Sequence, residues 1–312
     1  MSSEQYNPRI LNQLTELAEK YGTSGQDLSS YLDGLLYARY LHYADYIQIE
    51  TLLSLQRPRT DQPDELIFIM YHQITELYFK LINWELKQIA DNKNINQEYL
   101  LNKVLRLNRY WDNLIYSYDI MIHGMEAEQF MKFRMSLLPA SGFQSFQFRL
   151  IEIYSTDLIN LIDKRFLDKL ASNPTIEDMF EHLYWKHGAQ ELATGKKTLT
   201  LKQFEEKYTR KLLRNANNFK EKNLSKVAQN LAVKETLADP LKTALRDYDF
   251  RVNVLWPSSH FRSAARFLDK KPEVLEATGG TNWQKYLPPR FQRKVFFPFL
   301  WSESEKEDWG KV

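Results

Sequence analysis

The chain has 312 residues, of which 43% are hydrophobic and 14% aromatic, so it can bury the core of one large domain or of two ordinary ones. Its 42 basic and 40 acidic residues leave a net charge of +2, which gives no reason to expect a nucleic acid or an anionic membrane as a partner. The chain has no cysteine, which excludes disulfides, thiolate metal sites and cysteine nucleophiles.

The sequence predicts an all-α fold, because long segments have helical periodicity and the chain has only ten glycines and eleven prolines. The N-terminal residues are polar and charged, unlike a secretory signal peptide. No stretch approaches the ~18–20 apolar residues of a membrane span. We therefore expect a cytoplasmic protein that folds as a single helical domain over residues 1–312.

The first predicted helices lie over residues 8–21 and 31–56. A third helix is predicted over residues 64–86, where Asp64 and Glu65 follow a proline and lie at the positive end of the helix dipole. Apolar residues occur all round this third helix, which predicts that it is buried.

Phe68 and His72 lie four residues apart in this helix and therefore share a face. An aromatic ring beside an imidazole on a rigid helix can form one wall of a pocket for an aromatic ligand. The same pair can also be a core aromatic beside a histidine that is hydrogen-bonded to a neighbouring helix. A buried polar side chain without a partner costs about 1–3 kcal/mol, so both interpretations require a partner for His72.

Further helices are predicted over residues 96–122, 126–134 and 143–162. Gln144 and Gln147 lie in an apolar and aromatic segment, so we expect their side chains to bind backbone groups or neighbouring side chains. Residues 164–250 are more polar and charged, which predicts surface helices and loops in a more peripheral helical segment. A last helix is predicted over residues 247–274, followed by a packed aromatic C-terminal tail.

Three polar residues stand out against apolar surroundings, namely His72, Arg134 and His260. The planar guanidinium of Arg134 can clamp a carboxylate, or it can pair with Glu126 or Glu128. A lone histidine on an apolar helix face is often structural, but two such histidines can bracket a flat cofactor. In a chain without cysteine, histidine is the expected axial ligand of a heme iron.

Four blocks of the sequence closely resemble the tryptophan 2,3-dioxygenase family: YADYIQIETLLSLQ, DELIFIMYHQITELYFK, FMKFRMSLLPASGFQSFQFR, and WPSSHFRSAARFL with ATGGTNWQKYLP. They follow the family order over about residues 40–300. The resemblance implies an all-α enzyme with heme b as cofactor, assembled as a homotetramer that is a dimer of dimers.

The reaction implied by this resemblance is cleavage of the indole C2=C3 bond of L-tryptophan with O2, which gives N-formylkynurenine. One alternative is a related heme-dependent oxygenase that acts on another indole or on a tyrosine-like amino acid. Two further alternatives are a non-enzymatic binder of heme or aromatic ligands and a helical scaffold without a cofactor.

The resemblance also implies roles for individual residues. His260 would be the proximal ligand of the heme iron, and His72 would be the distal, catalytic histidine that accepts the indole N–H. Ser141 and Gly142 would belong to the segment over the distal side of the heme. The implied substrate-binding residues are Phe68, His72, Arg134, Thr278, Tyr43, Tyr46 and Phe130.

Within that set, Phe68 would pack on the indole, Arg134 would bind the substrate carboxylate, and Thr278 would lie near the substrate ammonium. Thr278 precedes two glycines, so an ordinary turn is the alternative interpretation of this residue. Phe130 occupies a position at which some family members have a tyrosine. In this family, the N-terminal region of a neighbouring subunit helps to close the pocket.

Overall fold

The computed structural model describes residues 7–23, 25, 27–38, 42–138, 144–190, 196–270, 273–274, 284 and 287–311. The chain divides into two units, Met1–Leu55 and Gln56–Val312. The described elements are helical except for the antiparallel pair of β1 (Asp269–Lys270) and β2 (Glu273–Val274). The predicted all-α class is confirmed, whereas the single domain over residues 1–312 stays a prediction.

The helices of the first unit are α1 (Pro8–Gly22), α2 (Leu28–Tyr37), α3 (Tyr43–Ile47) and α4 (Ile49–Leu53), and none of their residues is buried. The helix predicted over residues 8–21 is confirmed as α1. The single helix predicted over residues 31–56 is wrong, because α2 ends at Tyr37 and Gln48 takes a left-handed conformation with φ 53°. Short helices depend on tertiary packing, and the first unit provides no buried face to extend them.

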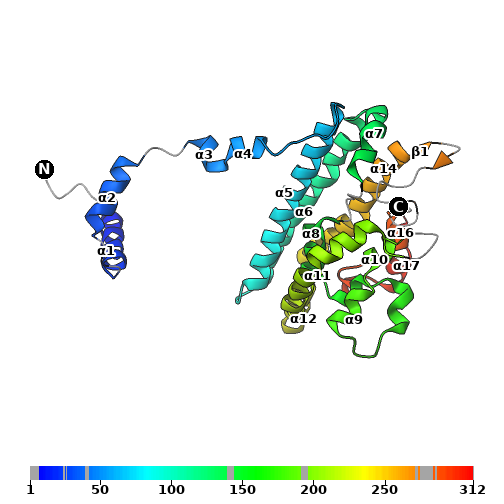
Figure 1. Cartoon of the computed structure of the whole chain (residues 1–312). Helices are drawn as coiled ribbons and strands as arrows, with labels where there is room; N and C mark the ends of the chain where they lie inside the picture. The colour runs from blue at the N-terminus through cyan, green and yellow to red at the C-terminus, as the bar shows by residue number, and fades with distance from the viewer. Residues whose placement is uncertain are drawn as a thin grey trace. The chain divides into compact units, whose positions relative to one another are not determined.

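The second unit is organised around two long helices, α5 (Asp64–Asp91) and α6 (Gln97–His123), which lie side by side (Figure 1). Glu65 accepts hydrogen bonds from the backbone N–H groups of Arg59 and Thr60, and Asp64 accepts one from the N–H of Glu126. Helix α5 therefore starts at Asp64, as the sequence predicts, and its two acids bind the segments that precede α5 and α7.

Local signals also set the limits of α6. The side chain of Asn96 accepts a hydrogen bond from the N–H of Tyr99 and caps the first turn. Gly124 ends the helix, and a Cβ at this position would lie 2.6 Å from the carbonyl oxygen of Ile120. The helix predicted over residues 96–122 is confirmed. The cap at Asn96 and the close backbone approach at Gly124 set its two ends.

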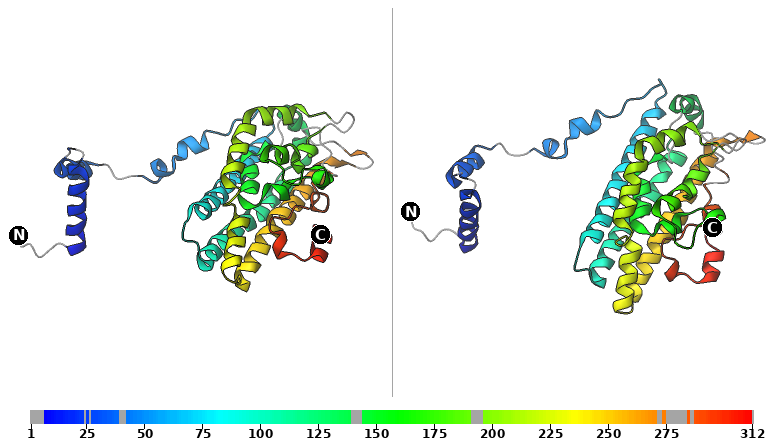
Figure 2. Two further views of the ribbon diagram at one scale, coloured as in Figure 1. Left: turned by 90° about the horizontal axis from the view of Figure 1, so that it is seen from below. Right: turned by 60° about the horizontal axis from the view of Figure 1, so that its bottom comes forward.

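The helix that carries His260 runs without interruption through α13 (Asp239–Phe250), a π-helical turn (Arg251–Leu255) and α14 (Trp256–Leu268). Both α13 and α14 pack on α6. Figure 2 shows the chain from two further sides. Pro257 is the second residue of α14 and lies directly after the π-helical turn, so it neither starts nor ends this continuous helix.

Buried aromatic rings fill the space between α5, α6 and α14. The ring centroids of Phe79 and Trp111 lie 5.9 Å apart, and those of Trp111 and Trp256 lie 5.5 Å apart. Phe148 adds a ring from α8 (Phe146–Ser155), 5.5 Å from Phe79. These contacts join segments that are far apart in the sequence into one core.

The remaining helices are α7 (Ala127–Phe133), α9 (Ile176–Glu181), α10 (Tyr184–Gly188), α11 (Leu199–Phe219), α12 (Leu224–Lys234), α16 (Pro289–Gln292) and α17 (Glu303–Glu307). Short 3₁₀ helices span Arg134–Leu137, Leu158–Leu161, Lys164–Lys169 and Pro298–Leu300. Residues 164–250 do not form only surface helices as predicted, because Phe204, Leu212 and Tyr248 are fully buried. The helices of this segment are amphipathic, so one face carries charged residues and the other packs into the core.

Both glutamines that the sequence singles out bind neighbouring groups, as predicted. Gln147 donates from Nε2 to the backbone oxygen of Glu76 at 2.8 Å and to its carboxylate at 2.9 Å. Gln144 donates from Nε2 to the backbone oxygen of Thr200 at 3.1 Å. These bonds hold the start of α8 against α5 and α11.

The prediction that α5 is buried all round is wrong, because one stripe of this helix is exposed. The stripe consists of Leu66, Met70, Ile74, Leu77, Leu81 and Trp84, which are 38–63% exposed. A cavity of about 690 Å³ lies along its second half and is lined by Leu81, Trp84 and other residues. The helices that pack on α5 within the second unit leave this face uncovered.

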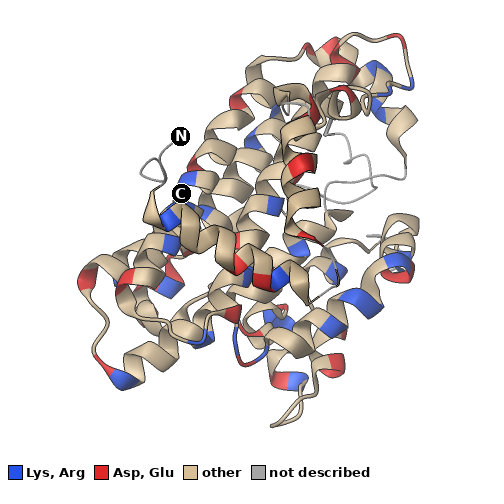
Figure 3. Ribbon diagram, turned by 90° about the vertical axis from the view of Figure 1, so that its left-hand side faces the viewer, with Lys and Arg blue, Asp and Glu red and all other residues tan. Residues whose placement is uncertain are grey.

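Basic and acidic residues are interspersed along the ribbon in the view of Figure 3. This distribution agrees with the net charge of +2. Among the described residues, no helix combines the length and the apolar content that crossing a bilayer requires.

Candidate functional site

His72 lies in the first half of α5 and is half-buried. Its ring centroid lies 4.1 Å from that of Phe68, so the predicted pair does share one face of the helix. His72 Nδ1 lies 2.7 Å from the carbonyl oxygen of Phe68. The partner of His72 is therefore its own helix, and not a neighbouring one as the alternative interpretation proposed.

This hydrogen bond determines which nitrogen of His72 carries the proton. A carbonyl oxygen only accepts, so Nδ1 must donate and carry the hydrogen. Burial lowers the pKa of His72 below its usual value, although the bond to Phe68 and the nearby Glu76 oppose this effect. The imidazole is therefore neutral at neutral pH, and its Nε2 presents a lone pair that can accept a hydrogen bond.

His260 lies in the second turn of α14 and is also half-buried. Its ring is nearly parallel to that of Tyr118, with the centroids 6.1 Å apart and an angle of 23° between the planes. Burial and, to a smaller extent, the nearby His72 lower the pKa of His260 to about 4.

Two tyrosines connect the histidines through ring contacts. Tyr71 lies 5.8 Å from His72 and 5.7 Å from Tyr118, measured between ring centroids. Tyr118 then contacts His260. The sequence identified neither tyrosine as a site residue, because their helical spacing indicates only core positions, although Tyr71 directly precedes His72.

Phe130 belongs to the same aromatic group. Its ring lies 6.1 Å from that of Phe68 and 4.6 Å from that of Phe267, and the side chain is buried. Phe133 on the same short helix lies 5.6 Å from Phe68. Helix α7 therefore places two rings beside the Phe68 and His72 face of α5.

Arg134 directly follows Phe133, and its side chain is 6% exposed. Burial lowers the pKa of Arg134 from its usual value. An arginine side chain nevertheless stays protonated at neutral pH. The structure shows other partners for the two acids that the alternative interpretation named. Glu128 lies 2.9 Å from Lys132, and Glu126 accepts a hydrogen bond from Gln129.

The remaining predicted site residues are not part of this described group. Tyr43 and Tyr46 lie on α3 in the first unit, where they are 74% and 75% exposed, and the structure does not place that unit relative to the second. Ser141, Gly142 and Thr278 lie outside the described residues.

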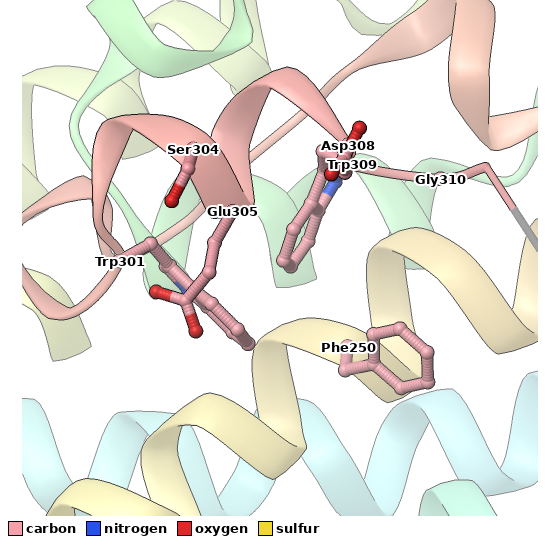
Figure 4. A pocket seen from close by; sticks show the side chains of 7 residues that line it. All are labelled: Phe250, Trp301, Ser304, Glu305, Asp308, Trp309 and Gly310. Carbon is pink, nitrogen blue, oxygen red and sulfur yellow. The ribbon is translucent and has the colours of Figure 1, made fainter.

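Two cavities of the described part of the chain do not contain the predicted site residues. One is the cavity along the exposed stripe of α5. The other, of about 300 Å³, is lined by Phe250, Trp301, Ser304, Glu305, Asp308, Trp309 and Gly310 (Figure 4). The candidate site is therefore defined by its side chains and not by either of these two cavities.

Comparison with known proteins shows the family to which the chain belongs. A sequence model of the family described as tryptophan 2,3-dioxygenase matches residues 35–255. A tryptophan 2,3-dioxygenase of Herpetosiphon aurantiacus is 30% identical over 279 residues, which cover 84% of this chain and 96% of the relative. The chain belongs to the tryptophan 2,3-dioxygenase family. The protein is therefore an oxidoreductase, as the sequence predicts.

Other relatives match a shorter part of the chain. A tryptophan 2,3-dioxygenase of Bacillus thuringiensis is 39% identical over 113 residues, which cover 35% of this chain and 39% of the relative. One of a Ruegeria species is 36% identical over 117 residues, which cover 37% and 42%. The span matched to the tryptophan 2,3-dioxygenase family includes Phe68, His72 and Arg134 but ends before His260.

Proposed function

We propose that this protein is a heme-dependent dioxygenase that uses O2 to cleave the indole C2=C3 bond of L-tryptophan and forms N-formylkynurenine. The observation that carries this proposal is the series of ring contacts by which Tyr71 and Tyr118 connect His72 on α5 to His260 on α14. His72 Nε2 is available as a hydrogen-bond acceptor, and His260 has a lone pair that can bind a metal. Membership of the tryptophan 2,3-dioxygenase family supports the same assignment.

The chemistry of His260 fits an axial ligand of heme iron. A ligand imidazole must be neutral, and a pKa of about 4 keeps His260 neutral at physiological pH. No hydrogen bond to either of its ring nitrogens is found among the described residues. The Tyr118 ring lies nearly parallel to the imidazole. A ferrous heme held there supplies the O2 chemistry, while the protein supplies binding and orientation.

The other residues would hold the substrate. His72 Nε2 would accept the indole N–H, because Nδ1 is already bound to the Phe68 carbonyl. Phe68 would pack on the indole, and Arg134 would bind the carboxylate through two parallel N–H bonds. Phe130 has no hydroxyl group, so it can contribute only packing to the carboxylate end. Contacts at both ends of the substrate would fix the indole bond that reacts.

Five further residues complete the proposed site by family resemblance. Thr278 would lie near the substrate ammonium, Ser141 and Gly142 over the distal side of the heme, and Tyr43 and Tyr46 at the pocket wall. The resemblance assigns the N-terminal region to the pocket of a neighbouring subunit. The first unit fits this role, because its helices bury no residue and Leu36 and Tyr37 are 80% and 86% exposed.

We further propose that the protein is a homotetramer built as a dimer of dimers. The exposed stripe of α5 supports this, because contiguous apolar surface of this kind marks an interaction site. The cavity beside the stripe offers a surface into which side chains of another subunit can pack.

The proposed function is tested by reconstituting the protein with heme, reducing it, and adding L-tryptophan and O2. N-formylkynurenine is the expected product, and replacement of His260 by alanine should abolish stable heme binding. A hydroxylated indole or phenol product would instead indicate the related aromatic oxygenase. Heme binding without turnover of any aromatic amino acid would indicate a heme binder, and unchanged heme content in His260→Ala would contradict the ligand assignment.

A further inference from the structure

One buried carboxylate joins the helix of His260 to the C-terminal segment of the chain. Asp249, near the end of α13, is fully buried. Its Oδ1 accepts hydrogen bonds from the backbone N–H of Phe296 at 2.9 Å and from Asn253 Nδ2 at 2.7 Å. Its Oδ2 accepts from the backbone N–H of Phe297 and from Trp301 Nε1, both at 3.0 Å.

These four donors match the four lone-pair sites of an ionised carboxylate. Burial raises the pKa of Asp249 to about 6, while the four hydrogen bonds act in the opposite direction and favour the charged form. Three of the donors come from the C-terminal segment, and Asn253 comes from the π-helical turn. The carboxylate therefore binds the C-terminal segment and the π-helical turn at the same time.

Aromatic packing surrounds this junction. Figure 4 shows Trp301 and Trp309 of the C-terminal segment beside Phe250, the residue that follows Asp249. The ring centroids of Trp301 and Trp309 lie 4.7 Å apart, and those of Phe250 and Trp309 lie 6.2 Å apart. The side chains of Asp249 and Phe250 thus both contact the same C-terminal segment.

The π-helical turn determines the direction in which His260 points. Trp256 donates its backbone N–H to the carbonyl oxygen of Arg251, five residues earlier, where an α-helix would use a residue four earlier. Each residue of an α-helix rotates the side-chain direction by about 100°. Without the extra residue of the π-helical turn, everything after it would turn by about that angle, and His260 would no longer face Tyr118.

We propose that Asp249 is a positioning residue for His260. By binding Asn253 inside the π-helical turn and the C-terminal segment outside it, the carboxylate holds the turn in place and so sets the orientation of the imidazole. The inference rests on the proposed role of His260 as the heme ligand. If Asp249 positions His260, its replacement should change heme binding, whereas replacement of a residue that only stabilises the core should not.

The chain offers a matched control in Glu152, which is also fully buried and also binds the C-terminal segment. It accepts hydrogen bonds from Lys294 Nζ at 2.8 Å and from the hydroxyl of Tyr184 at 2.6 Å. However, Glu152 lies on α8 and not on the helix of His260. Loss of either carboxylate should destabilise the protein, but only loss of Asp249 should alter the iron ligand.

The experiment compares wild type, Asp249→Asn and Glu152→Gln in the full chain. Heme affinity is measured by titration of the Soret band, the iron–histidine stretching band of the ferrous form by resonance Raman, and stability by thermal unfolding. We expect Asp249→Asn to weaken heme binding at least 10-fold and to shift or broaden the iron–histidine band. Glu152→Gln should lower the unfolding temperature and leave the band and the heme affinity at wild-type values.

A wild-type band and wild-type heme affinity in Asp249→Asn would overturn the inference, as would an equal shift in Glu152→Gln. If Asp249→Asn does not fold, Trp301→Phe decides, because it removes a single donor. A band shift in Trp301→Phe supports the inference, and an unchanged band overturns it. Heme that binds equally well to His260→Ala would contradict the proposed function itself, and with it this inference.

Discussion

His72 is held in position by the helix on which it lies. Its bond to the Phe68 carbonyl fixes the tautomer, and this leaves Nε2 as an acceptor. The sequence predicted that the two residues share a face, because four-residue spacing brings side chains together on a helix. It did not predict the bond, because a buried histidine can find its partner on any neighbouring segment.

Replacement of His72 by alanine should reduce the preference for L-tryptophan over 1-methyltryptophan. The methyl group removes the indole N–H that His72 would accept. One hydrogen bond contributes about 0.5–1.5 kcal/mol, so the ratio of the two kcat/KM values should fall by roughly 2- to 12-fold. Steady-state kinetics with both substrates measures the ratio, and an unchanged ratio would contradict the assigned role. His123→Ala, at an exposed histidine, serves as the control.

Replacement of Arg134 by leucine should raise KM for L-tryptophan with little effect on heme content. A hydrogen bond to a charged group contributes about 1.5–3 kcal/mol, which corresponds to roughly 10- to 150-fold in KM. Arg134→Lys keeps the charge but lacks the planar fork, so an intermediate KM is expected. Kinetics and the Soret absorbance are measured together, and loss of heme with an unchanged KM would assign Arg134 to the cofactor.

At the scale of elements, buried charges join α8 to segments that are distant in the sequence. Glu152 lies 2.6 Å from Arg149 and 2.8 Å from Lys294, and all three side chains are buried. Tyr184 completes the cluster by donating to Glu152. Because α8 also packs against α5, this cluster fixes the helix beside the one that carries His72.

Replacement of Glu152 by glutamine should lower the free energy of unfolding at pH 7 by about 3–5 kcal/mol, because it leaves buried cations without their counter-charge. Burial alone would raise the pKa of Glu152, but Arg149 and Lys294 hold it below its usual value of 4.5. Its contribution to stability is therefore fully present above pH 4.5 and is lost as the pH falls through the lowered pKa.

Urea unfolding of wild type and Glu152→Gln at pH 7 and at pH 3 measures this contribution. We expect the difference in unfolding free energy between the two proteins to become smaller at pH 3. A difference that is the same at both pH values would show that the carboxylate does not titrate with a lowered pKa in the folded protein.

At the scale of the whole molecule, a single chain leaves the apolar stripe of α5 exposed to solvent. The stripe of α5 has helical spacing, so a single partner surface can cover it. The first unit likewise has no buried residue of its own in its described helices. Both features agree with the proposed tetramer.

Replacement of Leu77 by aspartate should reduce assembly of the proposed tetramer and leave the fold of the subunit intact. Leu77 is 48% exposed at the centre of the stripe, so an aspartate at this position would be buried only if another subunit packs there. Val233→Asp, at a residue 87% exposed on α12, is the matched control. Sedimentation equilibrium of both variants measures the assembly state, and a tetramer in Leu77→Asp would contradict an interface on this stripe.

The sequence alone determined the helical class, the start of α5, both ends of α6 and the pairing of Phe68 with His72. Each of these depends on residues within one or two helical turns, such as an acid at a helix start, an asparagine cap or a four-residue spacing. The tertiary structure decided the exposed stripe of α5, the core contribution of residues 164–250 and the junction at Asp249. It also decided the approach of His72 to His260 through Tyr71 and Tyr118, because contacts between distant segments depend on how whole helices pack and leave no local pattern in the sequence.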